Sequence, residues 1–545
     1  MVKKYVNGII YTVDGAGWDE KPASEMAVDS NGIILHVGNN TPDKLHIDEI
    51  VDLGGKTVLP GFTDAHVHIP GMALTQLFEV DLFGAYTRDE IRDRVKAFIQ
   101  KHPDCDFIFG TGFDMSIVDE NGNMPSAEWI DDLCGEKKAV LQSYDMHSIL
   151  VNSVVLKELG IKDSADVYKG KGNIHCNKAA VPTGLLTDTW DLPVPKRIYT
   201  DNEICQALKL FERDMLAWGY TSIMAIAPFA KGLPIEILGD FKKCGMKLRT
   251  NSSVLIRPEL EEERMEELIE ARNAFDRPDL KITTAKYMID GVIEGQTAAL
   301  NTDYCNKAGF KGDTVWEYDK LTASFKRAIR NGFQIHCHTI GDAAVSMALK
   351  AIDEAQKQEN NYELRHVLTH LQLVDEDDCK LFGKNKLIAA VQTFWHYKEP
   401  DFYENIELPS LGTERCEKMY PLKSLKKNGA IITCSGDYPV SAVNNPMLGI
   451  QMGLTRNNPE AEDMNEQRYL LNAEERLSVA EMIEAYTVNG AYQLFREGET
   501  GTLKEGKAAD FIVLNNNPFN VDAMKISEIA VEKTFIKGQE VYTRV

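Results

Sequence analysis

The sequence predicts an α/β protein, a (β/α)8 barrel that carries a small β-sandwich built from both ends of the chain. Between residues 58 and 490, short apolar runs alternate with helix-like stretches of 3.6-residue periodicity. This alternation is typical of parallel strands joined by crossover helices, and eight such units close a barrel. Residues 1–57 and 491–545 are instead rich in short strand candidates separated by turns.

Each barrel strand is expected to end where an apolar run stops. Amphipathic periodicity over 88–100, 202–218 and 259–275 predicts helices in the same region. The expected strand ends lie near His68, Ile226, Leu255, Asp290, His338, His370, Phe394 and Asp437.

One stretch, about 84–200, does not fit the eight-unit count. It holds two additional strand candidates, at 107–109 and 139–141, and we interpret it as an insertion after the first barrel strand. The terminal parts show turn dipeptides instead, such as Asn31-Gly32 and Lys537-Gly538, next to apolar runs. These parts are expected to form the sandwich.

Composition excludes several classes of function. The net charge of -23 argues against a nucleic-acid partner, which needs clustered Lys and Arg. No apolar run reaches the ~20 residues of a membrane span, and residues 1–13 lack the apolar core of a signal peptide. Ten scattered cysteines without a Cys-x-x-Cys pair are not a disulfide framework, so we expect a cytoplasmic protein.

The first candidate for chemistry is His66 with His68. On a strand, side chains two residues apart share a face, so two imidazoles could converge on one divalent ion. An ordinary packed pair is the alternative. A second pair, His336 and His338, follows the same spacing, and His338 lies nearer the strand end, where barrel active sites form. His336 is expected one layer deeper, as a supporting or packed residue.

Two further candidates close apolar strands, His370 and Asp437. Asp437 alone could equally be a turn-capping residue. Lys286 lies inside a strand candidate, where an amine is costly unless it is paired or modified. It could pair with Asp290 or another acid, or it could be a lysine carbamate whose oxygens bridge two metal ions. Ligand-type residues thus fall at the ends of five strand candidates, which favours a metal site over scattered structural histidines.

These motifs together resemble the amidohydrolase superfamily, in the amidohydrolase family 3 branch of YtcJ-like and N-substituted formamide deformylase-like proteins. No single piece is specific, but the set in this order is. The matching stretches are 59–68 (LPGFTDAHVH), His147-Ser148, 151–153 (VNS), Asp290-Gly291, 338–342 (HTIGD), 370–372 (HLQ), 435–440 (SGDYPV) and 501–511 (GTLKEGKAADF).

The resemblance implies a metal-dependent hydrolase that acts on a non-peptide C–N bond of a small molecule, of amide or formamide type. It implies one or two divalent ions, usually zinc, although another divalent metal would also fit. The implied ligands are His66, His68, His338, His370 and Asp437, with Lys286 as the bridging lysine. Relatives often form homodimers. This chain has Thr339 and Thr369 where many members have Ala and Glu.

The expected mechanism uses a metal-activated hydroxide, because a bound metal lowers the pKa of water from ~15.7 towards ~7. Asp437 would take the proton and later give it to the leaving group. His147 and Asn152 are candidate substrate contacts, with a helix cap as the alternative for Asn152. Trp395, one of several aromatic residues near strand ends, could line a substrate pocket or simply belong to the core.

Other functions remain open on the same framework. A deaminase or a lactonase would use the same apparatus. Histidines acting as general acids and bases without metal would give an enzyme that survives chelation. A non-catalytic scaffold is a further alternative, although such proteins usually lack a metal ligand, and here each expected position is filled.

Overall fold

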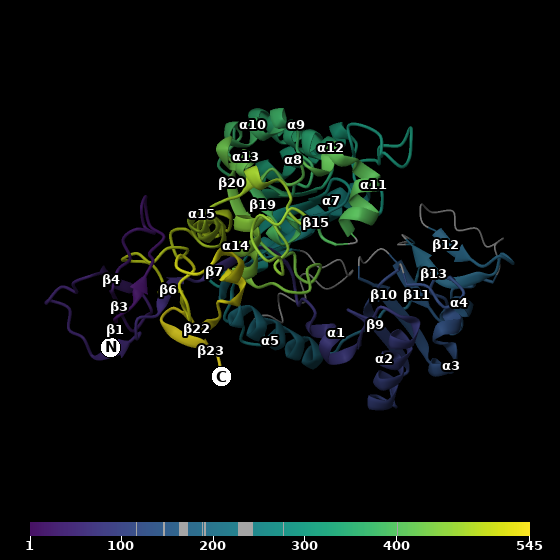
Figure 1. Ribbon diagram of the computed structural model, residues 1–545, viewed down its shortest axis with the longest axis horizontal. Helices are drawn as coiled ribbons and strands as arrows, with labels where there is room; N and C mark the ends of the chain where they lie inside the picture. The colour runs from purple at the N-terminus through teal and green to yellow at the C-terminus, as the bar shows by residue number, and fades with distance from the viewer. Residues whose placement is uncertain are drawn as a thin grey trace. The chain divides into compact units, whose positions relative to one another are not determined.

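Eight parallel strands form the central sheet of the computed structural model, as the sequence predicts (Figure 1). Their hydrogen-bonded order is β20-β19-β18-β17-β16-β15-β14-β7. The first and last strands also meet, because the His68 backbone N–H donates to the Tyr438 carbonyl just past β20, at 2.9 Å. The (β/α)8 barrel is therefore confirmed. The strands are β7 (Phe62–His68), β14 (Tyr220–Ile226), β15 (Arg249–Ile256), β16 (Leu280–Met288), β17 (Gln334–Thr339), β18 (Val367–His370), β19 (Ile388–Val391) and β20 (Ile431–Cys434).

The structure describes residues 1–115, 117–144, 148–162, 173–187, 189, 192–226, 243–275, 277–400 and 402–545. These fall into two compact units. Unit 1 is Met1–Ile69 with Glu212–Val545, and unit 2 is Pro70–Phe211.

Three strands end earlier than the sequence predicts, each for a local reason. After β16, Asp290 accepts backbone N–H groups from neighbouring loops, which takes it out of the strand. After β19, residues Thr393–Trp395 form a 3-10 turn in place of a strand. After β20, Asp437 has φ of 54°, which lies in the left-handed region and outside the extended backbone of a regular strand.

Amphipathic helices follow the strands. In α8, the residues Leu321, Phe325 and Ile329 recur every four positions and are buried against the barrel. The longer helices of this part are α5 (Asp201–Ala217), α7 (Glu261–Phe275), α8 (Tyr318–Arg330), α9 (Asp342–Glu359), α10 (Glu376–Lys384), α14 (Pro446–Thr455) and α15 (Val479–Tyr486). The shorter ones are α11 (Leu408–Leu411), α12 (Thr413–Cys416), α13 (Leu422–Lys427), α16 (Val488–Gln493) and the π-helical η4 (Tyr403–Glu407).

Unit 2 contains a six-stranded sheet of order β12-β13-β11-β10-β9-β8. Both faces of this sheet are covered, since Leu141 and Val140, adjacent on β10, belong to two different buried clusters. Its strands are β8 (Val80–Asp81), β9 (Phe107–Phe113), β10 (Lys138–Ser143), β11 (Ser148–Val151), β12 (Asn173–Cys176) and β13 (Pro182–Thr187). Its helices are α1 (Ala73–Phe78), α2 (Arg88–Lys101), α3 (Asp131–Cys134) and α4 (Ser153–Glu158). The narrower insertion bounds, about 84–200, stay a prediction.

Strands from both chain ends form two small sheets, of order β4-β3-β1-β5 and β2-β6-β21-β22-β23. One buried cluster joins the two sheets, and in it the ring of Tyr5 packs 5.1 Å from the ring of Phe511. The bounds are β1 (Lys3–Val6), β2 (Ile9–Ile10), β3 (Glu25–Val28), β4 (Ile34–Gly38), β5 (Glu49–Asp52), β6 (Thr57–Pro60), β21 (Phe511–Leu514), β22 (Val531–Ile536) and β23 (Gln539–Thr543).

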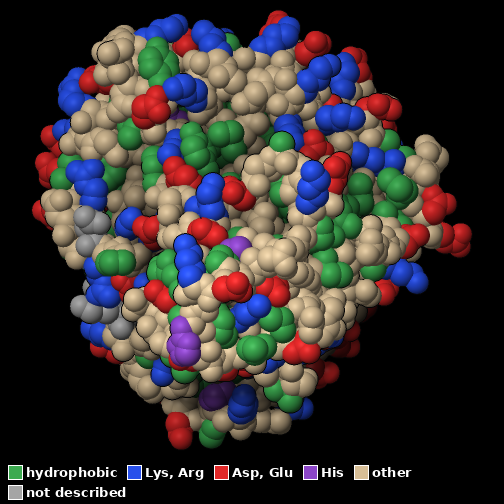
Figure 2. All heavy atoms as spheres, turned by 90° about the vertical axis from the view of Figure 1, so that its left-hand side faces the viewer, with side chains coloured by type: hydrophobic (Ala, Val, Ile, Leu, Met, Phe, Trp, Pro, Cys, Tyr) green, Lys and Arg blue, Asp and Glu red, His purple; other side chains and the backbone are tan. Residues whose placement is uncertain are grey.

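On one face of the molecule, charged side chains of both signs are mixed (Figure 2). Acidic and basic side chains alternate over the face shown in Figure 2, although the net charge is -23. Among the described residues, no helix combines the length and apolar character needed to cross a bilayer. Eight of the ten cysteines are free thiols, which is not the pattern of a disulfide-dense scaffold.

Candidate metal centre

Three of the predicted ligands lie together at the carboxyl ends of the barrel strands. His66 is on β7, His370 ends β18, and Asp437 follows β20. One ligand atom from each lies within 4.8 Å of the others. All three residues are buried, with exposures of 1%, 3% and 5%. Nitrogen and oxygen donors in a buried group of this size are what a divalent ion such as zinc requires.

The other two predicted histidines border this group. The His68 Nε2 atom lies 3.2 Å from Asp437 Oδ1, and the His66 Nε2 atom lies 3.3 Å from the same oxygen. The His338 and His370 rings have centroids 4.5 Å apart. Asp437 Oδ1 is buried and has no hydrogen-bond partner among the described residues, despite these two nitrogens nearby. A buried carboxylate oxygen without a hydrogen bond is suited to bind a cation.

Gln392 determines which nitrogen of His370 is free. Its Oε1 atom lies 2.8 Å from His370 Nδ1, while its Nε2 atom donates to Ser435 and Thr369 hydroxyls. Because the amide nitrogen is used as a donor twice, Oε1 is the acceptor, and His370 carries its proton on Nδ1. The Nε2 lone pair of His370 is then available to a metal.

Asp290 lies beside His338, but among the described residues the His338 Nδ1 atom has no hydrogen-bond partner. The Asp290 Oδ1 atom lies 3.4 Å from His338 Nδ1. The same carboxylate accepts the N–H groups of Ala299, Ile340 and Gly341 at 2.9–3.1 Å, and so holds two loops at the barrel mouth. The sequence suggested Asp290 as an ion-pair partner of Lys286, and this alternative is wrong.

Lys286 instead has no hydrogen-bond partner among the described residues, although it is only 2% exposed. Burial lowers the pKa of the Lys286 amine to about 8, against a smaller raising effect of Asp437. Near neutral pH a fraction of the amine is therefore neutral. Lys286 lies on β16 in register with His336 on β17.

Three imidazoles of the site, those of His66, His336 and His370, are in surroundings that favour their neutral form. Burial first, and then the nearby positive charge of Lys286, lowers the pKa of His66 and His336 well below the usual value. For His370, burial and then His338 and Lys286 lower the pKa in the same way. Neutral imidazole is the form that binds a metal.

A polar network below the site supports the first strand, and the sequence analysis missed it. Asp64 is fully buried and accepts the His66 backbone N–H at 2.9 Å and the Asn444 amide at 2.7 Å. The Asn444 oxygen accepts the Tyr220 hydroxyl at 3.1 Å. Burial raises the pKa of the Asp64 carboxyl to about 7. The sequence did contain a sign of this role, because Asp64 stands two residues before His66 in the same motif.

The backbone is strained at two of the predicted ligands. His370 and Leu371 have φ of 75° and 55°, and Asp437 has φ of 54°. Non-glycine residues in this region cost about 1–3 kcal/mol each, and such residues concentrate at functional sites. The strain turns His370 and Asp437 out of the regular strand direction.

The two unusual threonines both form hydrogen bonds. Thr339 donates to the Thr369 carbonyl at 3.1 Å, and Thr369 donates to the Ala390 carbonyl at 3.0 Å. Thr369 also accepts from Gln392, so it helps to orient the residue that faces His370. Neither threonine removes a predicted ligand.

The predicted substrate contacts have different outcomes. His147 lies outside the described residues. Asn152 is the N-cap of α4, and its side chain bonds the Val155 and Ala139 N–H groups and the Lys137 carbonyl, as the helix-cap alternative expects. Trp395 stacks on His370, with centroids 5.5 Å apart and planes inclined by 21°. Contact with substrate stays a prediction for all three.

Comparison with known proteins identifies the family of this chain. A family model described as "Amidohydrolase family" matches residues 49–542. The chain belongs to the amidohydrolase family. Membership of this family supports a metal-dependent hydrolase.

Amidohydrolase-family relatives match along almost the whole chain. The "Putative amidohydrolase YtcJ" of Bacillus subtilis is 26% identical over 98% of this chain and 98% of its own length. The "N-substituted formamide deformylase" of Arthrobacter pascens is 21% identical over 99% of this chain and 98% of its own length. A solved "uncharacterized metal-dependent hydrolase" from Pyrococcus horikoshii has a TM-score of 0.74 at 22% identity, over 96% and 99% of the two chains, which shows the common fold.

Proposed function

We propose that this amidohydrolase hydrolyses a non-peptide C–N bond, of amide or formamide type, at the group formed by His66, His370 and Asp437. The observation that carries the proposal is this buried group of ligand atoms within 4.8 Å of one another. His68, His338 and Lys286 complete the proposed set of ligands around one or two zinc ions. The name of the Arthrobacter pascens relative supports formamides as a substrate class.

The ion, Asp437 and Trp395 have different parts in the proposed reaction. A divalent ion bound there would supply a Lewis acid that polarises the substrate carbonyl and lowers the pKa of a water. Asp437 Oδ1, buried and without a hydrogen bond, accepts the proton of the attacking water and delivers it to the leaving nitrogen. Trp395, which stacks on His370, forms an apolar wall for the substrate.

Lys286 is proposed to react with carbon dioxide. The neutral amine attacks the carbon of CO2, a C–N bond forms, one proton leaves, and the product is an anionic carbamate. The Lys286 amine has no hydrogen-bond partner among the described residues, and this supports the proposal, because burying an unmodified amine without a partner is costly. With this change, Lys286 would add anionic oxygen donors to the residues that would hold the metal.

A regulatory role without catalysis is the main alternative. One relative, from Pectobacterium carotovorum, is named "Exoenzymes regulatory protein AepA" and is 24% identical over 79% of this chain. A scaffold has no need for neutral, oriented imidazoles beside a buried carboxylate oxygen that lacks a hydrogen bond among the described residues. The geometry therefore favours the enzyme.

The first prediction concerns Asp437. We expect Asp437→Asn to lose about 100-fold or more in kcat on N-substituted formamides, because the amide cannot take up the proton. The assay measures formate and amine release, together with zinc per chain. Removal of zinc by a chelator should also abolish turnover of the wild-type protein, and added zinc should restore it.

Asp377→Asn is the matched control, because it makes the same change on a side chain that is 93% exposed. It should leave turnover unchanged. Full activity in zinc-loaded Asp437→Asn would remove Asp437 from the mechanism. Full activity after complete chelation would contradict the metal-dependent reaction itself.

A further inference from the structure

His336 is a fully buried histidine at the candidate metal centre that the proposed reaction does not use. It lies on β17, and its exposure is 0%. Its Nε2 atom is 2.9 Å from His66 Nδ1, and the two ring centroids are 4.9 Å apart. Pairing with β16 holds it in register with Lys286. It is therefore in direct contact with a proposed ligand and rigidly placed.

Counting protons on the two rings shows what this contact does. A hydrogen bond between two ring nitrogens contains one proton, which either ring can carry. His66 Nε2 is the atom that faces Asp437, at 3.3 Å from Oδ1. If that nitrogen presents its lone pair to a cation, the proton of neutral His66 must be on Nδ1. His336 Nε2 must then be the acceptor.

We propose that His336 is a positioning residue that holds His66 in the Nδ1–H tautomer and so turns the Nε2 lone pair toward the metal. This inference rests on the proposed metal site. In this arrangement the proton of His336 is on its own Nδ1, and His336 does not bind the ion.

The neighbouring ligand shows the same arrangement with a different partner. Gln392 Oε1 accepts from His370 Nδ1 at 2.8 Å, and the donor roles of its amide nitrogen fix that direction. An acceptor behind the ligand ring makes it more basic and prevents rotation. His336, on β17, and Gln392, just after β19, thus perform one task from two places in the barrel.

The experiment measures zinc affinity of the full-length protein, stripped of metal and titrated in competition with a coloured chelator. His336→Leu removes the acceptor, and His336→Gln replaces it with an amide oxygen. We expect the Leu variant to bind zinc about 10–100-fold more weakly, as for other residues behind metal ligands. The Gln variant should bind within about threefold of wild type, because its oxygen can accept the same proton.

His366→Leu is the matched control. His366 is also a fully buried histidine, and its Nδ1 atom accepts the Ile335 N–H at 3.0 Å, away from the ligands. Its loss should lower the melting temperature without changing zinc affinity. Thermal unfolding of each metal-free variant separates loss of fold from loss of metal.

A double-mutant cycle with His66→Ala tests whether His336 acts through His66. The effect of His336→Leu should disappear when His66 is absent, since nothing is left to orient. An undiminished effect would overturn the proposal and make His336 a ligand itself, as would a Gln variant that binds as weakly as the Leu variant. Wild-type affinity in a folded Leu variant would also overturn it.

The proposed function and this inference can fail separately. A wild-type protein that binds no zinc would contradict both. A wild-type protein that binds zinc tightly, with His336→Leu unchanged, would contradict only the role of His336. If His336→Leu does not fold, the His336→Gln variant still decides between an acceptor and a ligand.

Discussion

At the scale of single residues, the imidazoles at the metal centre differ in what lies behind them. His66 has another histidine, His370 has an amide, and His338 has a carboxylate at 3.4 Å. Residues that are distant in sequence thus give each of these predicted ligands a different neighbour.

Glu407 is a second residue whose environment is unusual. It lies on η4, is 4% exposed, and accepts the Gln372 amide at 2.7 Å. Burial, followed by the charges of Glu294 and Glu399, raises the pKa of the Glu407 carboxyl to about 8. The ordinary value of 4.5 applies to the unfolded chain.

This shift predicts how stability depends on pH. Below pH 4.5 both states bind the proton, and between 4.5 and about 8 only the folded state does, so the free energy of unfolding falls as pH rises. Glu407→Gln keeps the shape and the acceptor for Gln372 but cannot ionise. We expect it to be more stable than wild type at pH 8, by on the order of 3 kcal/mol.

Urea unfolding at pH 4.5, 6 and 8 measures this difference. The two proteins should be about equally stable at the lowest pH. As the pH rises, the free energy of unfolding of the wild type should fall below that of the variant. A constant difference across the range would show that the Glu407 carboxyl ionises normally in the folded chain.

At the scale of elements, turns decide how the terminal sheets meet. Gly32 has φ of 78°, and a Cβ atom built there would lie 2.0 Å from the Lys537 carbonyl oxygen. The Gly32 carbonyl also accepts the Ala509 N–H at 2.8 Å. A turn near the start of the chain therefore contacts the backbone near its end, and this contact requires glycine.

We predict that Gly32→Ala destabilises the protein by more than the roughly 1–2 kcal/mol of a left-handed alanine. The additional loss comes from pushing the turn away from Lys537. Chemical denaturation measures the change in the free energy of unfolding.

Gly54→Ala is the control for backbone strain alone. Gly54 has φ of 58° and has nothing within 4 Å of its Cβ position. Equal losses in the two variants would show that the approach of Gly32 to Lys537 contributes nothing.

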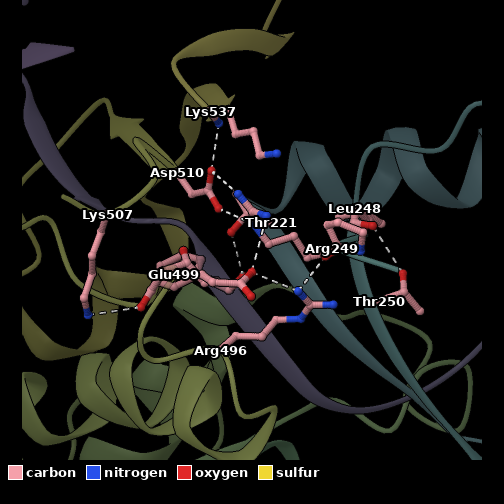
Figure 3. A network of polar contacts seen from close by, with 12 residues as sticks. Thr221, Leu248, Arg249, Thr250, Arg496, Glu499, Lys507, Asp510 and Lys537 are labelled. Atoms are coloured by element: carbon pink, nitrogen blue, oxygen red, sulfur yellow. Dashed lines mark hydrogen bonds and ion pairs between the residues drawn. The ribbon is translucent and has the colours of Figure 1, made fainter. Parts of the chain in front are cut away.

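At the scale of the barrel and terminal sheets, buried charges join the two (Figure 3). Arg249, at the start of β15, forms an ion pair with Asp510 at 2.6 Å, and both are buried. Asp510 also accepts the Lys537 N–H at 2.7 Å. Arg496 donates to Asn251 and to Glu499 in the same region. The C-terminal segment is thereby attached to the base of the barrel, away from the metal centre.

We predict that Asp510→Asn lowers the free energy of unfolding by about 3–5 kcal/mol, because the buried Arg249 charge loses its partner. Asp14→Asn, which removes an exposed partner of Lys504, should cost less than about 1 kcal/mol. Calorimetry or urea unfolding compares the two. Similar small effects would mean that solvent reaches Arg249.

The sequence by itself determined the barrel, its strand candidates and the residues proposed as ligands. Hydrophobic periodicity is a local property, and ligand-type residues such as His68 and His370 stand at the ends of apolar runs that can be read along the chain. The helix expected at 88–100 is α2 (Arg88–Lys101), and the one expected at 202–218 is α5 (Asp201–Ala217).

Only the tertiary structure decided which partners these residues have. Gln392 faces His370, His336 faces His66, and Asp290 lies beside His338 rather than pairing with Lys286. Each of these contacts joins residues on or just after different strands, and the direction of a side chain at a strand end depends on backbone angles that periodicity does not encode. Pairing across strands sets which polar atoms meet, and burial sets which protonation state they keep.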